Sequence, residues 1–177
     1  LFHEDGQIKV NIANETMQAV SGKVKTYLCR NDFTVLEEAE LQYTVDALSS
    51  LDIGSVSDAA MTAPQDCYLY ADVYDEDGTF LMRQTLLFAL PKDFAWKEPN
   101  IRVEIKDRAD GVEITVSASA FAKYVEIDFK EADVVLSDNY VDVTSTAPVT
   151  LFAKTSHNAA ELKDQLTVQS VYNIGRD

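Results

Sequence analysis

Apolar and polar residues alternate with a period of two through most of the chain. Ile8, Val10 and Ile12 alternate with polar residues, and Leu41, Tyr43 and Val45 repeat the pattern. This period places alternate side chains on opposite faces of a β-strand. It predicts strands over residues 8–12, 24–29, 41–45, 68–74 and 80–90.

A tight turn is predicted between the last two of these strands. Asp75-Glu76-Asp77-Gly78 separates them, and Asp-Gly readily adopts the positive φ that a hairpin turn needs. The acidic run also resembles a calcium loop, but the acidic spacing of an EF-hand is absent. The sequence therefore favours a hairpin over a metal site.

The pattern divides the chain into two parts. Residues 90–99 contain two prolines and no alternation, which indicates a linker because proline lacks a ladder donor.

Asn158, with Glu161 three residues later, predicts a short helix before Leu166. Further strands are predicted over residues 101–105, 112–116, 124–129, 134–143, 149–152 and 166–172. This spacing is typical of β-sandwiches, so the predicted fold class is all-β, with two tandem immunoglobulin-like β-sandwich domains over residues 1–94 and 95–177.

Three hydrogen-bonding residues interrupt the stretch VVLSDNYVDV at residues 134–143. Ser137, Asp138 and Asn139 separate two apolar runs, and Tyr140 follows. Burying such side chains costs free energy unless they find partners, and Asp and Asn commonly bond nearby backbone amides. We therefore expect these four residues to form a structural motif where a strand leaves one sheet and crosses to the other. Asp138 would accept backbone amides, Tyr140 would pack inward, and Asp142 would face solvent. The alternative is a calcium or sugar contact through Asp138 and Asn139.

Composition and charge limit the partners of the chain. Hydrophobic residues make up 46% of the 177 residues, enough for a packed core. No apolar run approaches the roughly 20 residues of a membrane helix. The net charge of -15, from 30 acidic and 15 basic residues, disfavours nucleic acid and anionic membrane surfaces. We expect neither nucleic acid nor a membrane as a partner.

No motif indicates catalysis, a cofactor or a metal. Cys29 and Cys67 lie in apolar runs, which favours free buried thiols over a disulfide. His3 and His157 are far apart in sequence, and His157 is interpreted as a solvated loop residue rather than a base. Phosphate-loop, nucleophile-elbow and zinc patterns are absent. We therefore predict no catalytic, cofactor-binding or metal-binding residue in this chain.

The interrupted stretch also carries a family resemblance. Phe129-Lys130-Glu131-Ala132-Asp133 followed by LSDNYVDV resembles the Ser-Asp-Asn-Tyr-Phe segment in the last domain of β-mannosidases and related exo-acting enzymes of glycoside hydrolase family 2, the β-galactosidase-like superfamily. VTLFAKTS and LTVQSVYN resemble later strands of that domain, while IKVNIANETMQAVSGKVKTYL and SSLDIGSV resemble the domain before it. The chain departs from the family at residues 143–148, where a Leu-Leu-Pro-Gly-type turn is common.

The resemblance implies the non-catalytic C-terminal accessory region of a retaining exo-β-mannosidase-like glycoside hydrolase. The two catalytic glutamates of that family lie on an upstream (β/α)8 barrel, and no residue here matches them. The expected partners are the catalytic barrel and N-terminal domains of the parent chain, with a weak carbohydrate contact left open. The alternative is a freestanding carbohydrate-binding or cell-surface immunoglobulin-like module. The start at Leu1 suggests a soluble fragment, located in the bacterial cytoplasm or exported with its parent.

Overall fold

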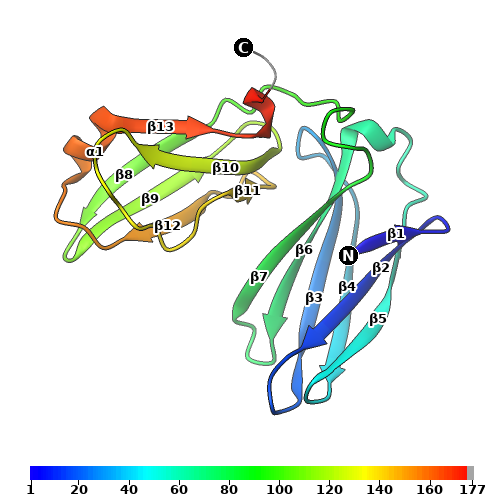
Figure 1. Ribbon diagram of the computed structural model, residues 1–177. Coiled ribbons are helices and arrows are strands. Elements are labelled where there is room, and N and C mark those ends of the chain that lie inside the picture. Colours follow the sequence, from blue (N-terminus) through cyan, green and yellow to red (C-terminus); the bar gives the residue numbers. More distant parts are fainter. Residues whose placement is uncertain (175–177) are drawn as a thin grey trace. The chain divides into compact units, whose positions relative to one another are not determined.

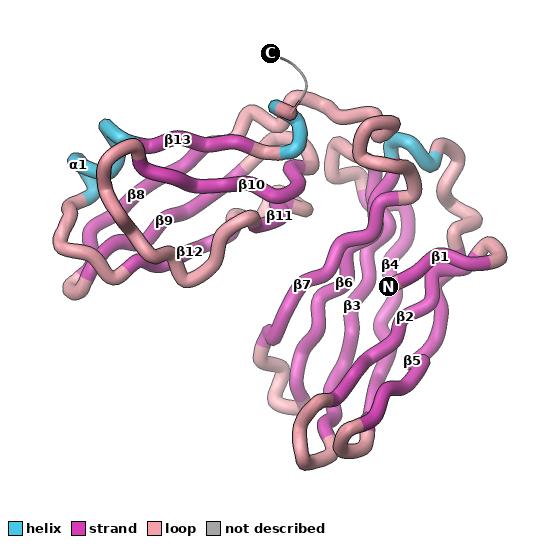
Figure 2. The backbone as a smooth tube through the Cα atoms, in the orientation of Figure 1, coloured by secondary structure: helices cyan, strands magenta, loops and turns pink. Residues whose placement is uncertain are grey.

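The chain folds as two compact units, Leu1–Ala95 and Trp96–Asp177. The computed structural model describes residues 1–174, so the last three residues of the predicted 95–177 domain lie outside the described part. Each unit is built from antiparallel sheets (Figure 1), and helical segments are few and short (Figure 2). The predicted all-β class is confirmed.

The first unit pairs a three-stranded sheet with a four-stranded one. The three-stranded sheet has the order β1-β2-β5, and the other has the order β4-β3-β6-β7. The elements are β1 (Phe2–Glu4), β2 (Gln7–Asn14), β3 (Val20–Arg30), β4 (Val35–Val45), β5 (Ser49–Ser57), a 3₁₀ helix (Pro64–Asp66), β6 (Cys67–Asp75) and β7 (Phe80–Leu87).

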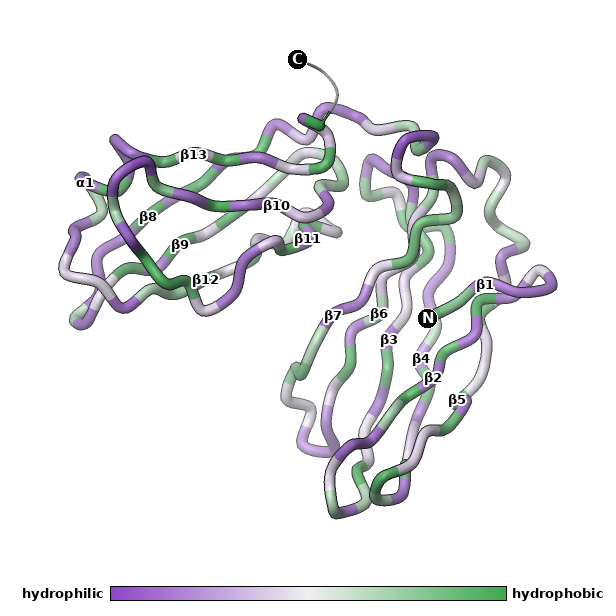
Figure 3. The backbone as a smooth tube through the Cα atoms, viewed as in Figure 1, coloured by the Kyte–Doolittle hydropathy of each residue, from purple (hydrophilic) through white to green (hydrophobic). Residues whose placement is uncertain are grey.

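Alternation along these strands forms the core of the first unit. Hydrophobic and hydrophilic segments alternate along the strands (Figure 3), and the inward set includes Ile8 and Val10 of β2, Val24 of β3 and Leu69 of β6. Because these residues come from both sheets, their burial holds the sheets together, at roughly 1.5–3 kcal/mol for each large side chain.

The hairpin predicted between β6 and β7 is confirmed. Gly78 has a φ of 82°, a left-handed conformation that glycine adopts without a Cβ clash. The Asp75 carboxylate accepts the Thr79 backbone N–H at 2.7 Å, and the Asp75 N–H donates to the Thr79 carbonyl at 3.0 Å. The acidic run therefore closes a turn.

Cys29 and Cys67 are free and buried. Cys29 pairs across the sheet with Tyr68, and Cys67 pairs with Arg30, so the two thiols point to opposite faces of the sheet. Burial raises the pKa of Cys29 to about 11 and that of Cys67 to about 12.

The second unit contains two three-stranded sheets, with the orders β12-β9-β8 and β11-β10-β13. Buried residues of both sheets, such as Ile114 of β9 and Ile127 of β10, form its core. The elements are β8 (Arg102–Arg108), β9 (Gly111–Ser117), β10 (Ala122–Phe129), β11 (Val141–Val143), β12 (Val149–Ala153), α1 (Ala159–Gln165), β13 (Leu166–Gln169) and a second 3₁₀ helix (Val171–Asn173).

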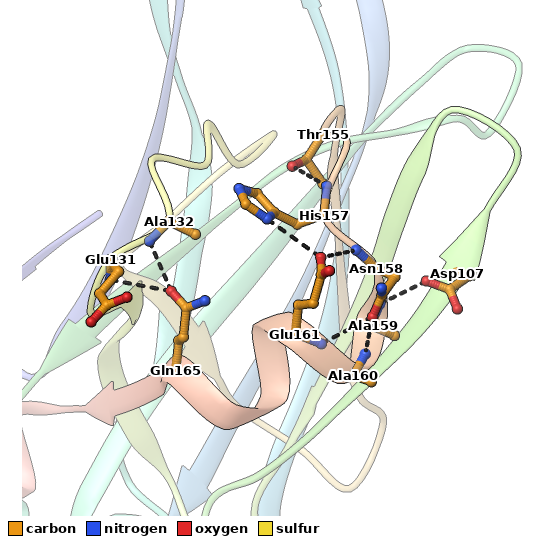
Figure 4. Close-up of polar contacts among 10 residues, drawn as sticks. All are labelled: Asp107, Glu131, Ala132, Thr155, His157, Asn158, Ala159, Ala160, Glu161 and Gln165. Atoms are coloured by element: carbon orange, nitrogen blue, oxygen red, sulfur yellow. Dashed lines mark hydrogen bonds and ion pairs between the residues drawn. The ribbon is translucent and has the colours of Figure 1, made fainter.

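The predicted short helix is present with its predicted cap (Figure 4). The Asn158 side chain accepts the backbone N–H groups of Ala160 and Glu161, each at 3.0 Å. Glu161 accepts the Asn158 N–H in return at 3.0 Å, which completes a capping box. The Asp107 carboxylate accepts the Ala159 N–H at 2.7 Å, so the helix start is also tied to β8.

Three predicted strand boundaries are wrong. Residues 134–136 contribute only a single bridge, Leu136 to Ala153, and Val135 is 80% exposed, so apolar composition misled there. The strand predicted over 166–172 ends at Gln169, because Ser170 and Asn173 bond each other and start a 3₁₀ turn. Residues 88–90 lie beyond β7.

Candidate functional site

The segment from Ser137 to Tyr140 connects the two sheets of the second unit. On the β12 side, the Ser137 N–H donates to the Phe152 carbonyl at 2.7 Å. The Phe152 N–H donates to the Ser137 hydroxyl at 3.0 Å. Ser137 therefore adds one residue to the edge of the β12-β9-β8 sheet.

Asn139 makes the connection to the other sheet. Its side-chain Nδ2 donates to the Ile127 carbonyl at 3.0 Å, and its Oδ1 accepts the Ile127 N–H at 2.9 Å. The same Oδ1 accepts the Tyr140 N–H at 2.9 Å. The amide thus presents to β10 the donor and acceptor that a neighbouring strand residue would present.

Asp138 has a smaller part than the sequence suggested. Its carboxylate accepts the N–H of the adjacent Asn139 at 2.8 Å, and its side chain is exposed. This is a local contact with the next residue along the chain. The bonds that span the two sheets come from Ser137 and Asn139.

The prediction that Tyr140 packs inward is wrong. Tyr140 is 58% exposed and has a φ of 57°. The Asn139 amide occupies the place beside the backbone of β10, and the left-handed turn at Tyr140 leaves its ring exposed. The Tyr140 hydroxyl donates to Glu126 at 2.8 Å, a bond that raises the pKa of Tyr140.

The prediction that Asp142 faces solvent is also wrong. Its side chain is 14% exposed and lies 3.0 Å from the Lys123 ammonium, whose side chain is 9% exposed. The other carboxylate oxygen accepts the Tyr124 N–H at 2.8 Å. In the sequence, Lys123 follows the buried Phe121 and Ala122 and comes shortly before the buried Val125. A lysine in such an apolar run is a signal that it needs a carboxylate partner when it is buried.

A β-bulge lies beside this ion pair. The register between β10 and β11 shifts between Ala122 and Val125, and Tyr124, inside the shift, has a φ of 51°. Bulges redirect side chains, and a bulky residue in this conformation costs on the order of 1–3 kcal/mol and persists only where its surroundings impose it. Here the bulge directs Tyr124, 53% exposed, toward solvent.

Tyr124 and Tyr140 line one groove on the surface of the second unit. The groove has a volume of about 380 Å³ and is lined by Tyr124, Glu126, Tyr140, Gln169, Val171 and Ile174, among others. Tyr124 and Glu126 were missed as site residues, although alternation back from Phe129 places both on the outer face of β10. Groups of three or more His, Cys, Asp and Glu side chains suited to a metal do not occur within residues 1–174.

The outer face of the four-stranded sheet in the first unit carries an aromatic and charged cluster. Tyr27 stacks on Tyr70 with ring centroids 4.7 Å apart, and the Arg83 guanidinium lies 4.8 Å from the Tyr70 centroid. Arg83 also makes a two-point contact with Asp72, at 2.5 and 2.7 Å. Asp72 is only 5% exposed, so this bidentate pair fixes the face rigidly.

Family comparisons match each unit separately. Residues 6–93 match a family described as the mannosidase Ig/CBM-like domain, and residues 96–174 match an Ig-fold domain of mannosidases. The chain is a tandem pair of mannosidase-type immunoglobulin-like domains. The predicted family resemblance is confirmed, as is the immunoglobulin-like fold of both domains.

Solved structures contain the same tandem pair as a small part of longer chains. β-D-Mannosidase from Dictyoglomus thermophilum superposes with a TM-score of 0.81 and 15% identity, over 96% of this chain and 21% of that one. The exo-chitosanase of Amycolatopsis orientalis gives a TM-score of 0.62 and 18% identity, over 92% of this chain and 24% of that one. The mannosidase-type pair thus spans about a fifth to a quarter of these chains, and the likeness shows the fold. Comparison with curated protein sequences gives no match.

Proposed function

We propose that this chain is the non-catalytic C-terminal accessory region of a retaining exo-β-mannosidase-like glycoside hydrolase. It packs on the catalytic barrel of the parent chain and helps to shape the active-site entrance. The observation that carries the proposal is the match of both units, in order, to domains of mannosidases.

The chemistry of the groove supports an accessory role. Retaining glycosidases need two carboxyl groups about 5–5.5 Å apart. The groove of the second unit is lined by the single carboxylate of Glu126, beside two tyrosines.

Among the described residues, no helix is long and apolar enough to span a bilayer.

We assign to packing an exposed apolar strip along the sheet edge at β7, where the side chains project from both faces of the strand. Phe80, Leu81 and Met82 are 51%, 54% and 45% exposed, respectively, and β7 lies at the edge of its sheet. Consecutive exposed apolar residues on an edge strand are a liability unless another surface covers them. The catalytic barrel is the surface that the mannosidase context offers.

The parent enzyme provides the test. Leu81→Lys should reduce its stability and its yield of soluble protein, because a charge would be placed in the interface with the barrel. Val135→Lys, at an 80% exposed position of the second unit, is the matched control and should behave like the wild type. Equal behaviour of the two variants, or a parent gene without a barrel-sized upstream segment, would contradict the proposal.

A freestanding carbohydrate-binding or cell-surface module remains the competing function. It predicts that the 177-residue chain occurs as a complete product of its gene, with the β7 strip open to solvent. The sequence context of the parent gene therefore separates the two proposals without any binding measurement.

A further inference from the structure

We propose that the groove between Tyr124 and Tyr140 binds a pyranose sugar ring, with the tyrosine rings contacting its C–H faces. Glu126 and Gln169 would bond its hydroxyl groups. This inference concerns a binding site within the second unit, so it holds whether or not the chain is attached to a catalytic barrel.

The first argument is the way the two tyrosines are presented. Each occupies a left-handed backbone conformation, and each has its N–H held by a side chain, Tyr124 by Asp142 and Tyr140 by Asn139. Both rings remain more than half exposed. A β-bulge at Tyr124 and a sheet crossing at Tyr140 therefore both expose an aromatic ring at the same groove. Backbone strain of this kind is concentrated at functional sites in proteins.

The second argument is that both rings are held in place without a ligand. The Lys123 ammonium lies 4.1 Å from the centroid of the Tyr124 ring, and the Tyr140 hydroxyl bonds to Glu126 at 2.8 Å. A preorganised site loses less conformational entropy when a ligand binds. The groove volume of about 380 Å³ lies at the lower end of the range for small-molecule sites.

The third argument is the chemistry of the lining. Tyrosine offers an apolar ring face and a polar hydroxyl, and a carboxylate and an amide stand beside it. A sugar ring matches both features, because it has apolar C–H faces and hydroxyl groups at its rim. Glu126 and the net charge of -15 disfavour an anionic ligand. Neutral sugars and protonated amino sugars share this chemistry, and an amino sugar would add an ammonium beside Glu126.

The test titrates the 177-residue chain separately with methyl β-mannoside, mannobiose and glucosamine, and detects binding by NMR spectroscopy. We expect a millimolar Kd for at least one of them. Asparagine tolerates positive φ, so Tyr124→Asn and Tyr140→Asn remove the rings without adding strain. Each should weaken binding about tenfold, or about 1.4 kcal/mol, because one of the two ring contacts is lost. Phe152→Ala, at an exposed aromatic residue outside the groove, is the control and should bind like the wild type.

Glu126→Gln then identifies the kind of sugar. It should abolish binding of glucosamine if the carboxylate meets an ammonium, and should change binding of a neutral sugar only a few-fold. The proposal is overturned if none of the three ligands binds, if choline binds in their place, or if the asparagine variants bind as well as the wild type. None of these results bears on the packing of β7, so failure here is distinct from failure of the accessory role.

Discussion

At the scale of single residues, the side chain of Asn139 takes the position of a strand residue. Val143 and Val141 of β11 pair with Ala122 and Val125 of β10, and two residues earlier the Asn139 amide bonds both backbone groups of Ile127. The pairing thus continues past the end of the strand through a side chain. A planar group with one donor and one acceptor is required there, which asparagine supplies.

Asn139→Ala should therefore destabilise the second unit. It leaves the N–H and C=O of Ile127 without these partners, at about 1–3 kcal/mol for each group that stays buried. The free energy of unfolding is measured in urea with tryptophan fluorescence as the signal. Trp96, the single tryptophan, reports on the second unit because it stacks on Phe121 there. Asp138→Ala removes one local bond at an exposed site and should cost about 0.5 kcal/mol or less. Equal costs for the two variants would contradict this assignment.

The two buried thiols should be unreactive in the folded protein. Burial holds their pKa values near 11 and 12, so the nucleophilic thiolate is scarce at pH 8. A thiol reagent such as Ellman's reagent should label neither cysteine at pH 8 until denaturant is added. Labelling of native protein at the rate of the unfolded chain would refute the prediction.

The same pKa shifts give a pH dependence of stability. An unfolded thiol loses its proton near pH 8.5, whereas the folded thiols keep theirs to about pH 11 or 12. The unfolded state then binds fewer protons, so the free energy of unfolding falls as pH rises. The contribution of the thiols is fully present below about pH 8.5 and is lost as pH rises through the folded pKa values. The variant with both cysteines changed to alanine should show a smaller fall, measured by circular dichroism.

Sequence reasoning could not assign the partners of the individual polar side chains. The residues that contact Asn139 and Asp142 lie 12 to 19 positions earlier, on β10, and depend on a register shift that no local pattern signals. The outward direction of Tyr140 follows from a positive φ, which a tyrosine does not indicate in a sequence. These features belong to the tertiary structure.

At the scale of elements, period-two alternation and turn chemistry predicted most strands, the hairpin after Asp75 and the cap of α1. β5 was not predicted as a strand, because its register with β2 shifts at Val10 and Asn11 and its pairing residues include serine, aspartate and glycine. Strands whose residues are mostly polar and that rely on a partner for their burial pattern are therefore the hardest to predict from sequence.

The cap of α1 should matter more than its length suggests. A seven-residue helix gains little from propensity, so Asn158→Ala, which removes two bonds to backbone N–H groups, should cost about 0.5–2 kcal/mol. Tryptophan fluorescence during urea unfolding again provides the measurement. Lys163→Ala, at an exposed position of the same helix, should change stability by less than about 0.5 kcal/mol, and a similar cost for both would exclude a specific effect of the cap.

At the scale of the whole molecule, the chain combines two β-sandwich units of the mannosidase type. The sequence supported this family assignment through the short motif from Ser137 to Tyr140 and through the order of less specific segments on both sides of that motif. In the accessory role that we propose, substrate choice would depend on residues of a catalytic barrel outside the described units, so no pattern in this chain could predict it.

The purified chain should not hydrolyse an aryl β-mannoside. Its groove offers one carboxylate, Glu126, whereas retaining hydrolysis needs a nucleophile and a separate acid. Release of nitrophenol from the aryl glycoside is the measurement, with a buffer blank as the reference. Activity that follows the chain through purification and disappears in Glu126→Gln would disprove this prediction.

The pairing of Asn139 with Ile127 also has a consequence for association between molecules. β11 covers β10 only as far as Val125, so the backbone groups of Ile127 would otherwise form an open sheet edge. Open edges invite strands from other chains, which leads to aggregation. The amide of Asn139 occupies this position with a side chain that cannot be extended into a further strand, so a strand of another molecule finds no free partner at Ile127.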